Sequence, residues 1–337
     1  MSLPTNISDG VSQSRIPAFG IIDSHLRRAK TLIHEQMTGP AEAGDMNQLL
    51  EHMNCRSSEM IRPGLVLLAG KCCGEITDEH IRVAAIIEII HNATLLHDDV
   101  IDKGQKRHNR SSINNSYGNE NSVLLGDFLL GRVFQMCAGL KPQVNEVIAA
   151  AAVRICEGQL RQIAQRQNWQ LSESEYIDVI TEKSAVIFST ACRLGAILSQ
   201  GTEPQTQALA EYGLNAGIAY QIAEDLLEVI ADENETGKTA GNDIDKRKLN
   251  LVFIHLLSSV DEKDKEAFIN SYCEQTDAKY DRDALAKMLR RYKSLEYIKA
   301  RAQDFVAESV KVLGLFNQSD AKNALIETVK FMACRTT

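Results

Sequence analysis

Two short acidic clusters in the sequence share the same internal spacing. They are Asp98, Asp99 and Asp102 in the first cluster, and Glu224, Asp225 and Glu228 in the second. In a helix, acids at i, i+1 and i+4 project at least two carboxylates from one face. Each cluster ends an apolar helical stretch, where carboxylates oppose the helix dipole at a cost of about 0.3–1 kcal/mol each. Two clusters placed this unfavourably indicate a cation that compensates their charge.

The ligand chemistry of the clusters favours Mg²⁺ as that cation, because hard oxygen ligands come without His or Cys. Mg²⁺ takes few carboxylates and completes its shell with phosphate oxygens and water. Basic residues accompany the clusters: Arg107 follows the first, Lys238 and Lys248 follow the second, and Lys183 with Ser184 lies between them. Each cation alone is better explained as a surface charge than as a ligand for phosphate. Together they predict a bound Mg²⁺–diphosphate, held as a leaving group by charge neutralisation.

The elements that carry these residues are predicted to be helices. Only 6 Pro and 20 Gly interrupt 337 residues, and few breakers over this length favour long helices. Apolar residues recur at helical spacing, and no segment alternates with the period of a strand. The spacing predicts helices over 20–37, 46–54, 62–73, 78–101, 119–139, 142–167, 172–200, 204–231, 245–258, 262–276, 281–293, 295–314 and 318–333. Polar loops are expected over 103–118 and 232–244.

Domain organisation follows from the absence of a Pro/Ser-rich linker between these helices. We expect one large all-α domain over 18–337, preceded by a disordered segment over 1–17. At 44% hydrophobic and 24% charged residues, the chain can bury a sizeable core.

Charge and cysteine content exclude several classes of partner. A formal net charge of −8 argues against nucleic acid and against anionic membrane surfaces. No apolar stretch is long enough to span a membrane, and no signal peptide is visible. The eight cysteines form no C-x-x-C pair, which indicates reduced thiols and a cytoplasmic protein.

Four strings resemble motifs of the trans-isoprenyl diphosphate synthase (polyprenyl synthetase) family. LLHDDVID (95–102) resembles its first aspartate-rich motif, and GIAYQIAEDLLEV (217–229) resembles its second, FQIxDDxLD. LLGDFLLGRVF (124–134) and TGKTAGNDI (236–244) also match, and the likeness runs from about 45 to 260. The resemblance implies an isoprenoid synthase type I fold, an all-α bundle around a deep central cavity, and a homodimer. It also implies that an allylic prenyl diphosphate ionises and that isopentenyl diphosphate attacks the cation.

The resemblance also assigns roles to residues of this chain. Asp98 and Asp102 would bind two Mg²⁺ ions, with Asp99 in support. A third ion would be held by Glu224, Asp225 and Glu228. The residues expected to act in ionisation are Asp98, Asp99, Asp102, Arg107, Lys183 and Lys238. The residues expected to bind substrate are Arg107, Lys183, Ser184, Gln221, Lys238, Lys248, Arg62 and His91.

The site for the second substrate departs from the family pattern. The family's GGKRxRP reads SSEMIRP over 57–63, so Arg62 is kept but the lysine is Glu59. The family's paired arginines after the first motif read Arg107-His108. At about 5 Å and an effective dielectric near 20, one charge pair is worth about 3 kcal/mol. Binding of isopentenyl diphosphate is therefore doubtful unless a neighbouring cation such as Lys106 or Arg110 compensates.

Three functions remain open on these residues. The first is a prenyltransferase that elongates an allylic diphosphate with isopentenyl diphosphate. The second is a terpene synthase-type lyase, for which an intact ionising site and a damaged acceptor site are typical. The third is a non-catalytic subunit of a heteromeric synthase, which the two intact acidic clusters disfavour.

Overall fold

The computed structural model describes residues 16–38, 44–54, 59–107, 110–230, 248–274 and 282–334. In chain order the elements are η1 (Pro17–Ile22), α1 (Asp23–Gln36), α2 (Gly44–Asn54), α3 (Ile61–Cys73), α4 (Asp78–Ile101), β1 (Lys106–Arg107), β2 (Arg110–Ser111), α5 (Ile113–Tyr117), α6 (Asn119–Cys137), α7 (Pro142–Ala164), α8 (Glu173–Ile180), η2 (Thr181–Ala185), α9 (Val186–Leu198), α10 (Glu203–Ile230), α13 (Leu251–Ser259), α14 (Glu262–Glu274), α15 (Arg282–Arg291), α16 (Ser294–Val312), η3 (Leu313–Leu315) and α17 (Asp320–Ala333).

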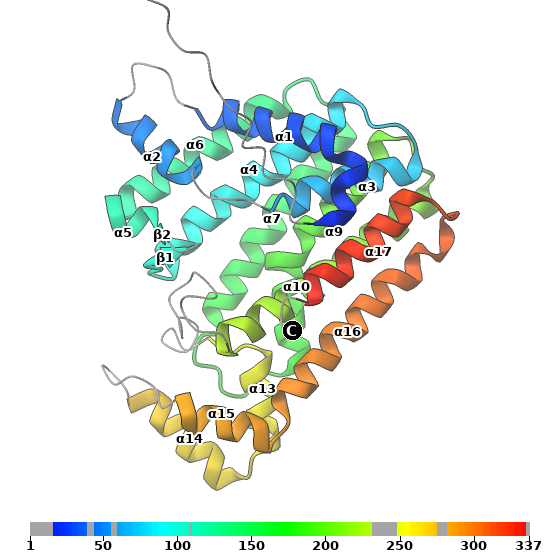
Figure 1. Ribbon diagram of the computed structural model, residues 1–337. Helices are drawn as coiled ribbons and strands as arrows, with labels where there is room; N and C mark the ends of the chain where they lie inside the picture. Colours follow the sequence, from blue (N-terminus) through cyan, green and yellow to red (C-terminus); the bar gives the residue numbers. More distant parts are fainter. Residues whose placement is uncertain are drawn as a thin grey trace, which may run out of the picture.

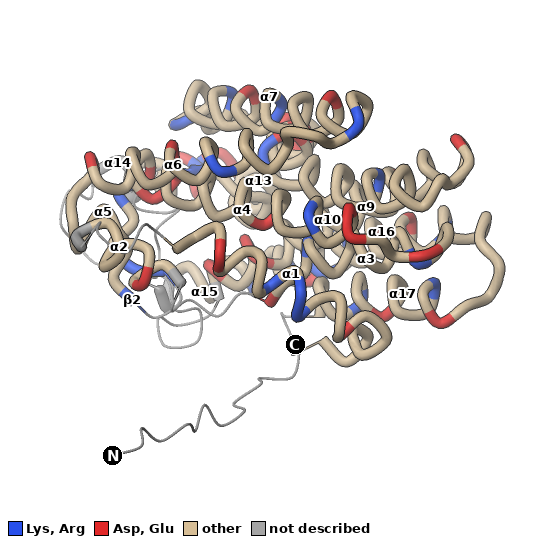
Figure 2. Tube along the Cα trace, turned by 90° about the horizontal axis from the view of Figure 1, so that it is seen from above, with Lys and Arg blue, Asp and Glu red and all other residues tan. Residues whose placement is uncertain are grey.

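The predicted all-α class is confirmed, and helix α10 runs through the middle of the bundle (Figure 1). It packs against α9 on one side and α16 on another, while α3 packs on α9 and α4 packs on α6. Helix α7 lies at the outside of the molecule when it is viewed from above (Figure 2). Within the described residues, no helix is long and apolar enough to cross a membrane.

Helices α3 and α4 are buried inside the bundle, which is why they lack a polar face along most of their length. Residues 63–70 of α3 are buried without interruption, and α4 is buried without interruption over 83–90. A helix that is apolar all round belongs inside a bundle. The core therefore positions the C-terminal end of α4, where the first acidic cluster sits, on a rigid support.

Three local features differ from the sequence-based expectation. The segment 103–118, expected to be a loop, contains the two-residue antiparallel ribbon β1–β2 and the short helix α5. The long helix expected over 172–200 is interrupted by one π-helical turn, η2. Helix α13 begins at Leu251 rather than 245, because the Asn250 side chain accepts hydrogen bonds from the backbone N–H groups of Val252 and Phe253.

The expected disordered segment 1–17 lies largely outside the described residues. Ile16 is buried at 1% exposure, and Pro17 begins η1. The assignment of 18–337 to a single domain stays a prediction.

Candidate active site

The first acidic cluster occupies the last turn and the C-cap of α4 and is surrounded by cations from distant segments. Asp98 lies 3.6 Å from the Nζ of Lys183 on η2. Asp102 accepts hydrogen bonds from Arg166 at 2.9 Å, just beyond α7, and from Lys248, just before α13. The tertiary structure thus brings three of the chain's basic residues to carboxylates that are one helical turn apart.

Asp99, the middle acid of this cluster, is held by Arg107 in a bidentate pair. The Nε of Arg107 lies 3.0 and 3.1 Å from the two carboxylate oxygens, and one Nη lies 2.7 Å from Oδ1. Asn114 fixes the same turn by donating to the backbone carbonyl of Asp99 at 3.1 Å. Burial by itself lowers the pKa of the Arg107 guanidinium, but Asp99, with Asp98 and Asp102, raises it overall.

Replacing Asp99 with asparagine is expected to lower the free energy of unfolding by about 2–4 kcal/mol, because a buried Arg107 charge loses its partner. The measurement is denaturant unfolding followed by circular dichroism. The control is Asp23→Asn, which breaks the exposed pair with Arg27 and is expected to cost less than about 1 kcal/mol. Equal losses in the two variants would show that the Asp99–Arg107 pair has no special structural role.

The second acidic cluster lies near the end of α10, where its middle acid is again the buried one. Asp225 is 8% exposed, and its Oδ2 accepts a hydrogen bond from the Tyr176 hydroxyl at 2.7 Å. Its Oδ1 accepts from the Nε2 of Gln221 at 2.6 Å. Glu224 and Glu228 are half-buried on a neighbouring face of the same helix.

A crevice lies beside hydrogen-bond partners of the two clusters. It measures about 20 Å³ and is lined by Gln162, Gln165, Arg166, Leu171, Tyr176, Val179, Lys248 and Leu249. Arg166 and Lys248 contact the first cluster, and Tyr176 contacts the second, whereas none of the six acids lines the crevice itself. The crevice is therefore built by residues in or next to α7, α8 and α13.

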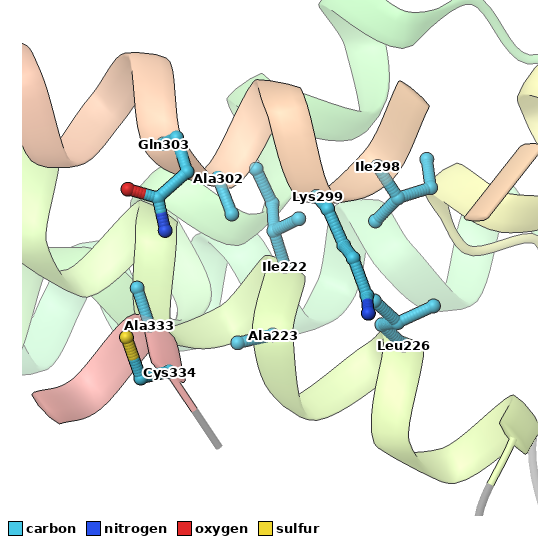
Figure 3. Close-up of a pocket in the computed structure, with 9 residues that line it drawn as sticks. All are labelled: Ile222, Ala223, Leu226, Ile298, Lys299, Ala302, Gln303, Ala333 and Cys334. Atoms are coloured by element: carbon cyan, nitrogen blue, oxygen red, sulfur yellow. The ribbon is translucent and has the colours of Figure 1, made fainter. Parts of the chain in front are cut away.

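A second pocket, of about 60 Å³, lies on the other face of α10 (Figure 3). Ile222, Ala223 and Leu226 line it from α10. At about 100° per residue these side chains point away from Glu224 and Glu228. The pocket belongs to the packing of α10 against α16 and the end of α17, and no acidic residue lines it (Figure 3).

Arg62, the retained arginine of the acceptor motif, is turned into the protein. Its guanidinium carbon lies 4.4 Å from the centroid of the Phe188 ring. Burial lowers the pKa of Arg62, although Glu88, Tyr220 and Glu224 around it act in the opposite direction. Burial, and then the charge of Glu224, raises the pKa of the Tyr220 hydroxyl. Arg62 therefore already faces negative groups of the protein.

Not every residue singled out in the sequence can be placed. Lys238 and His108 lie outside the described residues. His91 and Ser184 are half-buried, on α4 and η2. Glu59 is half-buried just before α3.

The sequence analysis did not single out three residues of the site: Arg166, Tyr176 and Gln162. Gln162 belongs to none of the motifs, but its side chain accepts a hydrogen bond from Lys183 at 2.8 Å. Gln162 and Arg166 are four residues apart, so a helix pattern places them on one face. That pattern also fits other polar residues of α7, and it does not show which face meets the acids.

Carboxylate chemistry in this site fits Mg²⁺ when the ion arrives with a phosphate ligand. Among the described residues, no three Asp, Glu, His or Cys side chains converge on one point as a complete metal cage. Mg²⁺ is usually held by one or two carboxylates, with waters and substrate phosphates completing the octahedron. The pairs Asp98–Asp102 and Glu224–Glu228 supply such carboxylates, and the cations beside the first pair suit the phosphates.

Comparison with known proteins identifies the family of this chain. The model of the polyprenyl synthetase family matches residues 44–289. The chain is 33% identical over 287 residues to a short chain isoprenyl diphosphate synthase of Methanothermobacter thermautotrophicus, covering 84% of this chain and 88% of that protein. It is 32% identical over 282 residues to the octaprenyl diphosphate synthase of Escherichia coli, covering 83% of this chain and 87% of that protein.

A solved structure supports the same assignment. The polyprenyl synthase of Caulobacter crescentus CB15, complexed with calcium and isoprenyl diphosphate, matches with a TM-score of 0.90 at 27% identity. The match covers 95% of this chain and 97% of that one. Because the family model covers residues 44–289 and two relatives are 32–33% identical over most of their length, the chain belongs to the polyprenyl synthetase family.

Proposed function

We propose that this protein is a Mg²⁺-dependent prenyltransferase that ionises an allylic prenyl diphosphate and elongates it with isopentenyl diphosphate. The observation that carries the proposal is the convergence of Lys183, Arg166 and Lys248 on the carboxylates of Asp98 and Asp102. A site that holds acids and cations this close suits a ligand of metal ions and diphosphate. The two relatives named above are a short chain isoprenyl diphosphate synthase and an octaprenyl diphosphate synthase, which supports the same activity.

The chain's own residues have separate tasks in ionisation. The carbon–oxygen bond of the allylic diphosphate breaks, and its electron pair leaves with the diphosphate. Lys183, Lys248 and Arg107 donate hydrogen bonds to the departing oxygens, and Lys238, Ser184 and Gln221 are proposed to complete this set. When bound, Mg²⁺ neutralises the charge that develops on the diphosphate. We propose three such ions, two at Asp98 and Asp102 and one at the second cluster.

The acceptor side favours a second candidate, a terpene synthase-type lyase. Glu59 replaces a lysine, and Arg62 is engaged by Phe188 and lies near Glu88 and Glu224. Both features weaken the attraction for a second diphosphate, and His91 would remain as its partner on α4. A lyase needs only the ionising half of the site.

The decisive experiment incubates the protein with C10, C15 and C20 allylic diphosphates and Mg²⁺, with and without isopentenyl diphosphate. Longer prenyl diphosphates that form only with isopentenyl diphosphate are expected for the prenyltransferase. Hydrocarbon or alcohol formed from the allylic substrate alone would instead establish the lyase. No turnover in any mixture, with binding to a catalytic relative, would establish the non-catalytic subunit.

We also propose a homodimer that forms through α6 and α7. Large apolar side chains are exposed on both helices: Leu124 (65%) and Phe134 (75%) on α6, and Val153 (56%) and Leu160 (67%) on α7. Large exposed apolar side chains on two consecutive helices are typical of a subunit interface.

Replacing Phe134 with glutamate and Leu160 with lysine is expected to convert the dimer into monomers, because charge is placed on the buried interface. Sedimentation velocity measures the change. Leu315→Glu, at an exposed apolar residue of η3, is the control and should leave the dimer intact. A wild-type protein that is monomeric, or a double variant that stays dimeric, would contradict this interface.

The compartment we propose is the cytoplasm. In the part of the chain that the structure describes, these cysteines form no disulfide: Cys72, Cys73, Cys137, Cys156, Cys192 and Cys334. Burial raises the pKa of Cys72 to about 12 and that of Cys73 to about 11, so these thiols stay protonated and unreactive at neutral pH.

A further inference from the structure

The middle acid of each cluster differs from the two outer acids. Asp98 and Asp102 are one helical turn apart and share a face, as do Glu224 and Glu228. The middle acid is turned by about 100° from the first acid of its cluster. It is also the buried one: Asp225 is 8% exposed, whereas Glu224 and Glu228 are half-buried.

Each middle acid has both carboxylate oxygens engaged by protein donors. Asp99 is held bidentately by Arg107. Asp225 accepts from Tyr176 at one oxygen and from Gln221 at the other, at 2.7 and 2.6 Å. Hydrogen bonds to a carboxylate are about twice as strong as those between neutral groups. These two hydrogen bonds and its burial fix the Asp225 carboxylate with its oxygens turned toward Tyr176 and Gln221.

The donor Tyr176 comes from the segment that carries the proposed diphosphate cation. Tyr176 lies in α8, which continues directly into η2, where Lys183 and Ser184 are located. Its ring is buried at 4% exposure, so the hydroxyl is fixed in place. The Tyr176–Asp225 hydrogen bond consequently ties the α8–η2 segment to the end of α10, next to Glu224.

We propose that Asp225 is a positioning carboxylate oriented by the Tyr176 hydroxyl, and that Glu224 and Glu228 alone supply the metal ligands of the second cluster. Asp225 then does for the second cluster what Asp99 does for the first. Tyr176 becomes a positioning residue that sets the second cluster against Lys183. This inference rests on the proposed function for the identity of the bound ligand, Mg²⁺ with diphosphate.

The test measures binding of inorganic diphosphate to the full chain by calorimetry, as a function of Mg²⁺ concentration. Tyr176→Phe is expected to raise the Mg²⁺ concentration for half-saturation about 10- to 100-fold, as loss of an orienting partner does at metal sites. Tyr212→Phe is the matched control. Tyr212 is a buried tyrosine of α10 whose hydroxyl donates to the carbonyl oxygen of Leu325 at 2.7 Å. It should leave the midpoint within about twofold, because Leu325 lies in α17 outside the crevice.

Two further variants keep the proposal testable if Tyr176→Phe does not fold. Asp225→Asn should shift the midpoint by about as much as Tyr176→Phe, whereas Glu224→Gln should shift it at least about tenfold further. In the Asp225→Asn background, Tyr176→Phe should add less than about twofold, because the hydroxyl acts through Asp225.

Outcomes of this test separate the inference from the proposed function. Absence of Mg²⁺-dependent diphosphate binding in the unaltered chain would overturn both. Binding in the unaltered chain with Tyr176→Phe indistinguishable from Tyr212→Phe would overturn the inference alone. So would equal losses in Asp225→Asn and Glu224→Gln, since Asp225 would then behave as a ligand.

Discussion

Replacing Asp98 with alanine is expected to lower kcat at least about a thousandfold, which corresponds to about 4 kcal/mol of lost transition-state stabilisation. Asp98 shares an accessible face with Asp102 at the end of α4 and faces Lys183 at 3.6 Å. Its removal takes away a proposed metal ligand and leaves the Lys183 ammonium without this partner. Diphosphate release from an allylic diphosphate, followed at saturating Mg²⁺, measures the effect.

The matched control for this prediction is Asp78→Ala on the same helix. Asp78 lies in the first turn of α4, about 30 Å from Asp98 at 1.5 Å per residue. Its side chain is 88% exposed and pairs with Arg28, so its loss should change kcat less than about twofold. Turnover of Asp98→Ala near that of the unaltered chain would refute the metal assignment at the first cluster.

The second large effect is expected at the acceptor side. Glu59→Lys combined with His108→Arg should lower the KM for isopentenyl diphosphate at least about tenfold. Each change replaces a repulsive or neutral group with a cation, and a charge pair at about 5 Å is worth about 3 kcal/mol at an effective dielectric of 20. Glu59 is half-buried, so screening by solvent reduces this figure but does not cancel it.

Steady-state kinetics with a fixed allylic diphosphate and varied isopentenyl diphosphate measures this prediction. Glu75→Lys is the control, because Glu75 is exposed beyond the opposite end of α3 and carries the same change of charge as Glu59→Lys. An unchanged KM in the double variant would mean that another cation already serves the acceptor diphosphate. A lower KM in Glu75→Lys would mean that overall charge, rather than position, controls binding.

The local sequence pattern was sufficient to predict the fold class and which acids share a helix face. Apolar periodicity and few breakers predict an all-α bundle, because each helix must bury its apolar face. The acidic spacing predicts which carboxylates share a face, since Asp98 and Asp102 are one turn apart. The expectation for 103–118 was wrong, because a two-residue ribbon and a one-turn helix are too short to leave a periodic signal.

Tertiary structure alone decided which distant groups meet these carboxylates. Arg166 is 64 residues from Asp102, and Tyr176 is 49 residues from Asp225. No local rule distinguishes Arg166 from Arg154 and Arg161 of α7, because helical spacing fixes a face but not the helix that packs on it. Tertiary packing also decided which acids are buried. Asp99 and Asp225 are enclosed by the protein, and hydrogen-bond donors around them offset the cost of burying a charge. The sequence determined where the acids are, and packing determined which of them remain accessible to a ligand.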